Sequence, residues 1–352
     1  MLCSSAYAGN TDETSNTKSS QSVLKEIAEK APKLSGYLQT GWNYSTAGDG
    51  TSSFQAKRLR LIADGEVTPK LAFRLQLEAF NGIAGSTNGN GQKNIQVMDA
   101  FATYSFSSAF KVRAGQYFLP LGYENYNISP ATLETVDFSN ICYRMVCRNP
   151  YEYDFVDYGR DLGVMIMGDL FLSQKGFHYM SYDLSVTNGS LPSKDDSNKS
   201  KDIVAALTFR PMEYLNFKAS YAWSESSHKD AEGIKTPYNT MNRVILGAWY
   251  NNPTGFDLRA EYGYLKGEKS AYDERGFYAL AGYHFQTNCG EILPVIRYDR
   301  YEDKVNTVSP NNYDRILAAI TYQPASRFKL QLNYQHAFYL SDAKKAIGDS
   351  GY

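Results

Sequence analysis

Arginine and lysine side chains recur at alternate positions along segments with a two-residue hydrophobic period. Alternate side chains of a β-strand point to one face, so these cations would line a common surface. A guanidinium group can hold a phosphate or carboxylate through two parallel hydrogen bonds, which makes the pattern typical of anion contact. Acidic residues occupy the same faces almost as often, which leaves a slight basic surplus. The basic set is Arg58, Arg60, Arg74, Lys111, Arg113, Lys218, Arg243, Arg259, Arg297, Arg315 and Lys329, and the acidic set is Asp64, Glu78, Asp99, Asp161, Asp169, Asp183, Asp257, Glu261 and Asp299.

Two local clusters of cations occur in this set, Arg58 with Arg60 and Arg113 near Lys111. With Arg74 they are our candidate anion contacts on the strands. Strict selectivity for phosphate would require a ladder of cations without interleaved acids, because guanidinium contacts are what hold the phosphate. The residues therefore predict at most a preference for anions.

The longest connection between these segments, residues 123–160, carries charges of both signs. If it folds into a channel, its charges lie at the narrowest point, where low-dielectric walls strengthen their field. The alternative is a surface loop whose charges are solvated. The basic candidates are Arg144, Arg148 and Arg160, and the acidic candidates are Glu152, Asp154 and Asp157.

Two cysteines of this loop, Cys142 and Cys147, lie five positions apart. In an oxidising envelope they could form a small disulfide that tightens the loop. Two thiols are the alternative, because spacing alone does not establish the geometry of a disulfide.

Signals of catalysis and of metal or cofactor binding are missing from the sequence. The four histidines are isolated, and no group of His and Cys has metal-ligand spacing. There is no G-x-S-x-G motif and no phosphate-binding G-K-[ST]. We therefore expect no catalytic residues, no metal and no cofactor.

Composition favours a membrane interface. The chain of 352 residues has a net charge of −1, which gives no electrostatic argument for nucleic-acid binding. Its 29 Tyr, 18 Phe and 3 Trp make up 14% of the residues. Tyrosine is favoured where one end of a side chain is apolar and the other is wet. The sequence contains no run of about 18 apolar residues, which is the length that would predict a transmembrane helix.

The hydrophobic period stays at two from Leu34 to Leu340. We predict fifteen strands of about ten residues or more, the length that crosses a bilayer when tilted. They cover 34–46, 53–67, 71–81, 95–107, 111–122, 161–171, 177–188, 201–211, 215–226, 242–252, 256–268, 274–286, 291–303, 313–324 and 327–340.

Connection lengths alternate between these strands. Short connections such as 67–70, 211–214 and 252–255 alternate with long ones such as 123–160. Short periplasmic turns and long outer loops are typical of bacterial outer-membrane barrels. The fold class predicted is therefore all-β, a transmembrane antiparallel β-barrel.

The two ends of the chain differ from the barrel region. Residues 1–8 contain the Ala6-Tyr7-Ala8 pattern of a signal-peptide remnant, and residues 9–33 read as a flexible linker with a short helix. Residues 34–352 form the predicted barrel domain. Its last strand is the fifteenth, whereas such barrels have an even number, so we expect a sixteenth strand to be missing from this sequence.

Two motifs in residues 111–168 resemble the phosphate-selective porin O and P family. One is an R-x-G-Q-Y-x-x-P-L-G strand, and the other is G-R-D-x-G-x-x-x-x-G after a long loop. The likeness extends over roughly residues 34–340. The residues that carry the motifs are Arg113, Gly115, Gln116, Tyr117, Pro120 and Gly122 in the first, and Gly159, Arg160, Asp161, Gly163 and Gly168 in the second.

The resemblance implies a sixteen-stranded pore in the outer membrane of a Gram-negative bacterium, commonly a homotrimer, with the third outer loop folded into the channel. The partners expected are outer-membrane lipid, lipopolysaccharide, and small solutes or inorganic anions. We expect no nucleic-acid partner.

Three functions fit these observations. The first is a porin for passive diffusion of small polar or anionic solutes. The second is a substrate-binding porin for sugars or organic acids, in which loop tyrosines stack on rings. The third is a structural or adhesive barrel with a plugged lumen. The tyrosines that the second function invokes are Tyr143, Tyr151, Tyr153 and Tyr158.

Overall fold

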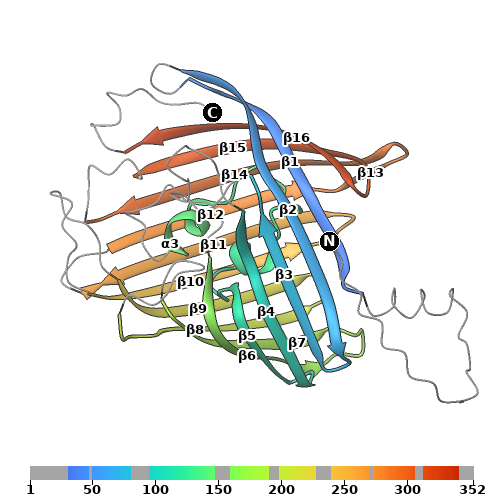
Figure 1. Cartoon of the computed structure of the whole chain (residues 1–352). Helices are drawn as coiled ribbons and strands as arrows, with labels where there is room; N and C mark the ends of the chain where they lie inside the picture. Colours follow the sequence, from blue (N-terminus) through green and yellow to red (C-terminus); the bar gives the residue numbers. More distant parts are fainter. Residues whose placement is uncertain are drawn as a thin grey trace, which may run out of the picture.

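The computed structural model describes residues 31–46, 50–80, 95–146, 159–189, 198–226, 239–268, 273–305 and 312–340. Within these ranges the strands form one antiparallel sheet that curls around two short helices (Figure 1). The signal-peptide remnant and the short helix expected near the N-terminus lie outside the described residues, as does everything after residue 340. No helix in the described part is long and apolar enough to cross a membrane.

Each strand pairs with its neighbour in chain order, so the sheet is a continuous meander. The strands are β1 (Lys33–Ser45), β2 (Thr51–Thr68), β3 (Leu71–Glu78), β4 (Gln96–Ser107), β5 (Phe110–Phe118), β6 (Arg160–Leu172), β7 (His178–Thr187), β8 (Asp202–Met212), β9 (Leu215–Ser226), β10 (Asn239–Asn251), β11 (Phe256–Gly267), β12 (Asp273–Tyr283), β13 (Phe285–Thr287), β14 (Gly290–Asp303), β15 (Tyr313–Ala325) and β16 (Phe328–Tyr339).

Within the described ranges, fifteen strands follow one another as hydrogen-bonded neighbours across the sheet, and the short strand β13 pairs only with β14. Both β12 and β13 pair with β14, so they form one span that is interrupted at His284. The fifteen predicted spans are therefore confirmed. Among the described residues no ladder joins β1 to β16, and the sheet stays open along that seam.

Side-chain alternation gives the sheet an apolar outer face and a polar inner face. On β11, Leu258 and Tyr262 are 42% and 43% exposed. Arg259 and Glu261, which lie between them in the sequence, are 4% and 3% exposed. This is the arrangement predicted for a barrel in lipid, where unpaired backbone groups and charges cannot face the hydrocarbon.

One predicted boundary is wrong in an informative way. The sequence predicts a strand over 111–122, but β5 ends at Phe118. Pro120 has no N–H to donate to a ladder, and Gly122 adopts a φ of 71°. The carbonyl oxygen of Leu119 instead accepts from the side-chain amide of Asn125. The chain therefore turns out of the sheet.

A close contact between β4 and β5 requires glycine at position 115. Gly115 has a φ of 124°, and a Cβ there would lie 2.2 Å from the carbonyl oxygen of Ala100.

We predict that Gly115→Ala destabilises the folded barrel by at least about 1–3 kcal/mol, the strain of a non-glycine residue in this conformation. Urea unfolding followed by the heat-modifiable band on gels would measure the change. Gly41→Ala is the matched control, because a Cβ at position 41 meets nothing within 4 Å. Equal unfolding midpoints for the two variants would contradict the prediction.

Candidate functional site

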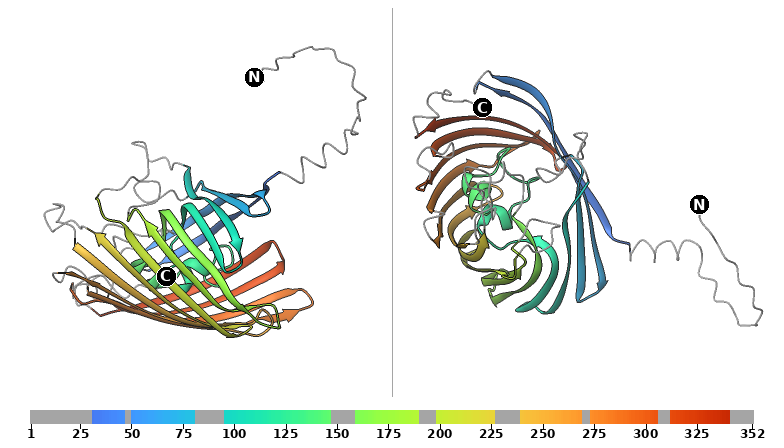
Figure 2. Two further views of the ribbon diagram at one scale, coloured as in Figure 1. Left: turned by 90° about the horizontal axis from the view of Figure 1, so that it is seen from below. Right: turned by 60° about the vertical axis from the view of Figure 1, so that its left-hand side comes forward.

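The connection after β5 folds into the interior of the sheet. We call residues 119–146 the inner loop; it contains α2 (Tyr123–Asn127) and α3 (Asn140–Met145). Both views in Figure 2 show these helices inside the curl of strands. The Oγ atom of Ser139 caps α3 by accepting a hydrogen bond from the backbone N–H of Cys142. The described part of the longest connection, up to residue 146, therefore folds inward.

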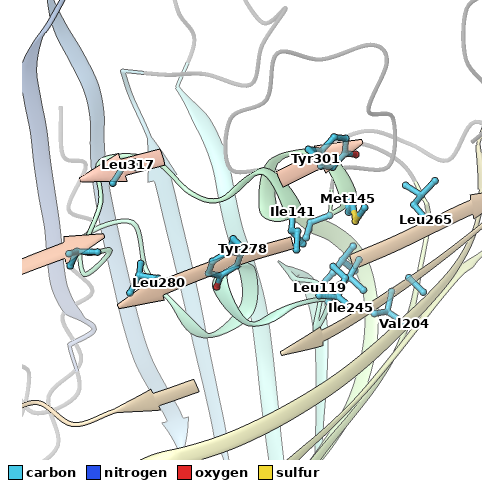
Figure 3. Packing of buried hydrophobic residues seen from close by; sticks show 14 of the residues in the cluster. Leu119, Ile141, Met145, Val204, Ile245, Leu265, Tyr278, Leu280, Tyr301 and Leu317 are labelled. Atoms are coloured by element: carbon cyan, nitrogen blue, oxygen red, sulfur yellow. The ribbon is translucent and has the colours of Figure 1, made fainter. Parts of the chain in front are cut away.

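An apolar cluster holds the inner loop against the wall formed by β8–β15. Leu119, Leu121, Ile141 and Met145 are at most 1% exposed and pack with wall residues such as Ile245 (Figure 3). Burial of side chains of this size contributes about 1.5–3 kcal/mol each. The inner face of this wall is therefore a packed core rather than the wholly polar surface that alternation predicts.

The wall is shaped to receive α3. At Gly263 on β11 a Cβ would lie 2.3 Å from the sulfur of Met145. At Gly276 on β12 it would lie 2.9 Å from Ile141. Glycine at both positions lets the helix approach the strands this closely.

Three buried arginines of the wall also hold the inner loop. Arg243 donates to the carbonyl oxygens of Met145 and Val146, at 3.1 and 2.9 Å. Arg297 donates to Thr135 Oγ1 and to the carbonyl oxygen of Phe138, at 3.0 and 3.1 Å.

The third, Arg259, binds a carboxylate of the inner loop. Its Nη1 lies 2.8 Å from Glu134 Oε2, and its Nη2 also reaches Glu134, which makes the contact bidentate. Its Nε lies 3.0 Å from Asp257 Oδ1 on the same strand. Removing one partner of such a buried pair costs far more than the pair gains, because a charge is left without compensation.

Contacts on both sides of the open seam complete the docking. From β16, Lys329 and Gln331 donate to the carbonyl oxygen of Leu133 at 2.8 and 2.9 Å. From β2, Lys57 forms an ion pair with Asp137. The inner loop thus contacts strands near each edge of the sheet.

Two buried glutamates meet at the start of α2. Glu261 of β11 accepts hydrogen bonds from the backbone N–H groups of Tyr123 and Glu124. Glu124 accepts from the N–H of Ser139 at 2.7 Å, while its Oε1 has no hydrogen-bond donor within the described ranges. Burial raises the pKa of Glu124 to about 7, although Arg297 lies 3.8 Å from that oxygen and opposes the shift.

The opposite wall brings together three of the sequence-predicted cations. Arg60 pairs with Glu78 at 2.9 Å, and Arg160 pairs with Asp99 at 2.6 Å. The side-chain amide of Gln76 donates a hydrogen bond to Asp99 and accepts one from Arg60, and it thereby links the two ion pairs. The third cation, Arg58, donates to Gln39 Oε1 at 2.7 Å. All three arginines are buried.

The remaining strand candidates lie nearer the short-turn end. Arg74 pairs with Asp64 at 2.7 Å, and Lys111 pairs with Asp169 at 2.7 Å. Arg113 is different: its Nε donates to Thr103 Oγ1 at 3.1 Å and its guanidinium lies 4.2 Å from the centre of the Phe101 ring.

The structure describes only some of the predicted loop residues. Arg144 is half-buried in the last turn of α3, and Cys142 is buried against Phe138 and Trp249. The disulfide and the role of these residues in a constriction stay predictions. The residues outside the described ranges are Cys147, Arg148, Tyr151, Glu152, Tyr153, Asp154, Asp157 and Tyr158.

Three acids that hold the inner loop in place are absent from the sequence-predicted candidates. Glu124, Glu134 and Asp137 lie within residues 123–160, and each contacts a basic residue of the strands. The sequence does contain an indication of their role, because the strands carry more basic than acidic residues on their inner faces and these loop acids could pair with the surplus. In the described part of the chain no three His, Cys, Asp or Glu side chains converge as metal ligands.

A curled antiparallel sheet with an apolar outer face, a charged inner face and a long connection folded inside defines a transmembrane β-barrel channel. The family model of the phosphate-selective porins O and P matches residues 35–350, and the chain belongs to this family. It is therefore a porin of the bacterial outer membrane.

Solved structures agree with this fold. OmpF of Salmonella typhi, in complex with daunomycin, is 15% identical with a TM-score of 0.62, over 92% of this chain and 96% of that chain. An anion-selective porin from Comamonas acidovorans is 15% identical with a TM-score of 0.58, over 87% and 88%. The trimer form of OmpT, an outer membrane protein of Vibrio cholerae, is 11% identical with a TM-score of 0.55, over 89% and 92%.

We predict that Arg259→Gln weakens docking of the inner loop by about 3–5 kcal/mol, because Glu134 and Asp257 lose their buried cation. Single-channel recordings should show a larger and noisier conductance, and proteases should cleave the inner loop faster. Arg327→Gln removes an exposed charge in a short turn and should change neither property. Unaltered conductance in Arg259→Gln would show that the pair does not hold the loop.

The raised pKa of Glu124 predicts a pH dependence of loop docking. Below its ordinary pKa of 4.5 the carboxyl is protonated whether the loop is docked or released. Between about 4.5 and 7 only the docked loop retains the proton, so docking weakens as the pH rises through this window and then levels off.

Current fluctuations recorded from pH 4 to pH 8 would test this dependence. They should increase with pH in the native protein and lose that increase in Glu124→Gln. Glu213→Gln alters an exposed acid in a short turn and should behave like the native protein. An identical pH profile in Glu124→Gln would refute the assignment.

Proposed function

We propose that this porin lets small polar and anionic solutes diffuse passively across the outer membrane, with a modest preference for anions and without a catalytic step. The observation that carries the proposal is the setting of Arg113 on the inner face of β5. Within the described ranges no carboxylate lies at ion-pair distance from it, and its side chain is partly exposed. Its charge is available to a passing anion.

Most other inner-face cations are engaged by partners. Arg60, Arg74, Lys111 and Arg160 form ion pairs with acids of their own wall, and Arg297 binds the inner loop. A paired charge contributes little field along the channel, because its partner cancels it at a distance. Selectivity then depends on the few cations that have no acidic partner.

A second guanidinium supports the same preference. Arg210 of β8 lies on the same face as the buried Thr208 and donates to Asn216 Oδ1 at 2.6 Å. No carboxylate of the described residues lies at ion-pair distance from it. Since β8 ends shortly after Arg210 and β5 begins shortly before Arg113, both charges lie toward the short-turn end of the sheet.

These observations favour weak anion preference over phosphate binding. Tight binding of phosphate needs several guanidinium groups that converge without acids. Arg113 and Arg210, two lumenal guanidinium groups without an acidic partner in the described ranges, lie on strands that are not neighbours in the sheet. The family name and the anion-selective porin of Comamonas acidovorans support the sign of the preference.

We also propose that the porin assembles as a homotrimer surrounded by outer-membrane lipid and lipopolysaccharide. The trimer form of the Vibrio cholerae OmpT, which shares the fold, supports this assembly. The exposed apolar side chains of the outer face, such as Leu38, Leu61 and Leu332, suit contact with lipid or with a second copy.

Reversal potentials in asymmetric KCl across planar bilayers test the proposed function. The native channel should be ohmic and prefer chloride, and Arg113→Gln should lower the chloride-to-potassium permeability ratio by a factor of about two or more. Arg300→Gln removes a charge from the outer face and should leave the ratio unchanged. Cation preference in the native channel, or an equal effect of both substitutions, would contradict the proposal.

A further inference from the structure

Charged side chains gather on the outer face of β11–β15, at the end of the sheet that carries the long connections. We call the four cations of this group, Lys266, Arg275, Arg300 and Lys304, the outer basic patch. Burial alternation places Lys266, Arg275 and Arg300 on the same face as the lipid-facing Tyr262, Phe277 and Ile296. Lys304 follows β14 directly and is exposed.

Strand register makes the patch continuous. Arg275 stands opposite Glu302, and Arg300 stands opposite Phe277 on one side and Asp314 on the other. Lys266 stands opposite Asp273. Residues directly opposite on paired strands lie about 5 Å apart, so these charges form one surface.

The cations of the patch are more exposed than the acids that pair with them. The side chains of Lys266, Arg300 and Lys304 are 46%, 47% and 44% exposed. The acids that pair with them are about half as exposed: Asp273 at 22%, Glu302 at 19% and Asp314 at 23%.

These pairs orient the cations without covering them. Arg300 Nε lies 2.8 Å from Glu302 Oε1, and Lys304 pairs with the same carboxylate. Arg275 has no carboxylate at ion-pair distance in the described part of the chain, and its guanidinium lies 5.6 Å from the centre of the Tyr264 ring. Hydrogen-bonding capacity of the guanidinium groups therefore remains for a ligand outside the barrel.

The corresponding outward positions elsewhere are apolar. Near the long-connection ends of β6, β7 and β8 the outward residues are Leu162, Val186 and Ile203, each more than 40% exposed. A charged patch at this height is thus a local feature and not a general property of the rim. Because long connections face the cell exterior, the patch lies at the level of the outer-leaflet headgroups.

We propose that the outer basic patch binds the phosphorylated headgroup of lipopolysaccharide. The headgroup presents phosphates on a sugar scaffold, and arginine and lysine pair with phosphate through charge-assisted hydrogen bonds. Tyr264 and Tyr298 supply the amphipathic rings that favour the headgroup level. The apolar residues below the patch would contact the acyl chains. The proposal rests on the outer-membrane location and is independent of solute preference.

Binding of diphosphorylated lipid A to the purified, folded porin in detergent, followed by native mass spectrometry, tests the proposal. The variant Arg275→Gln/Arg300→Gln/Lys304→Gln should lose affinity by about tenfold or more, since interfacial cations attract anionic headgroups. The matched control, Lys70→Gln/Lys175→Gln/Arg327→Gln, removes three exposed cations from the short turns. The control should bind like the native protein.

Additional measurements control for charge dependence, for the phosphate groups and for folding of the variant. Binding should weaken with added salt and with dephosphorylated lipid A, and Arg275→Gln alone should show a smaller loss if the triple variant folds poorly. Equal affinities of the patch and control variants would overturn the proposal. So would a patch variant that changes the oligomeric state but keeps its lipid A affinity, which would assign the surface to a second copy of the chain. Chloride preference measured in parallel distinguishes failure here from failure of the proposed function.

Discussion

The need to pair buried arginines determines how the interior of this porin is built. Arg243, Arg259 and Arg297 extend from one wall and are each at most 4% exposed, and an uncompensated charge in such a buried position costs several kcal/mol. The inner loop supplies their acceptors, as backbone carbonyl groups and as the carboxylate of Glu134. The loop in turn brings its own apolar residues to the wall. Charge pairing and apolar burial therefore depend on the same docked position.

Docking of the loop also determines which charges remain for solutes. The loop uses many of the cations on β10–β16, and local acids pair with most of those on β2–β6. Arg113 lies outside both networks. The channel is thus rich in arginine, yet most of the arginines on the inner face of the described strands are held in contacts with the inner loop or with their own wall. Because the inner loop contacts β2 and β16, it also connects strands on both sides of the open seam.

Most of the fold was predictable, because strand formation leaves a local signal in the sequence. Alternation of Leu258, Arg259, Ala260 and Glu261 predicts both the strand and its two faces, and the structure confirms them. The ends of strands were less predictable. β5 ends at Phe118 and not at residue 122, because Pro120 has no N–H for the ladder and the Leu119 carbonyl oxygen accepts from the Asn125 side chain instead.

The sequence by itself determined the fifteen spans and the outer-membrane class, since these follow from a period of two and from connection length. Only the tertiary structure decided which basic residue pairs with which acidic residue. Glu134 and Arg259 are 125 positions apart, and nothing local to either residue indicates the other. Pairing depends on how the loop enters the curled sheet, and it determines which arginines are held in the interior of the protein.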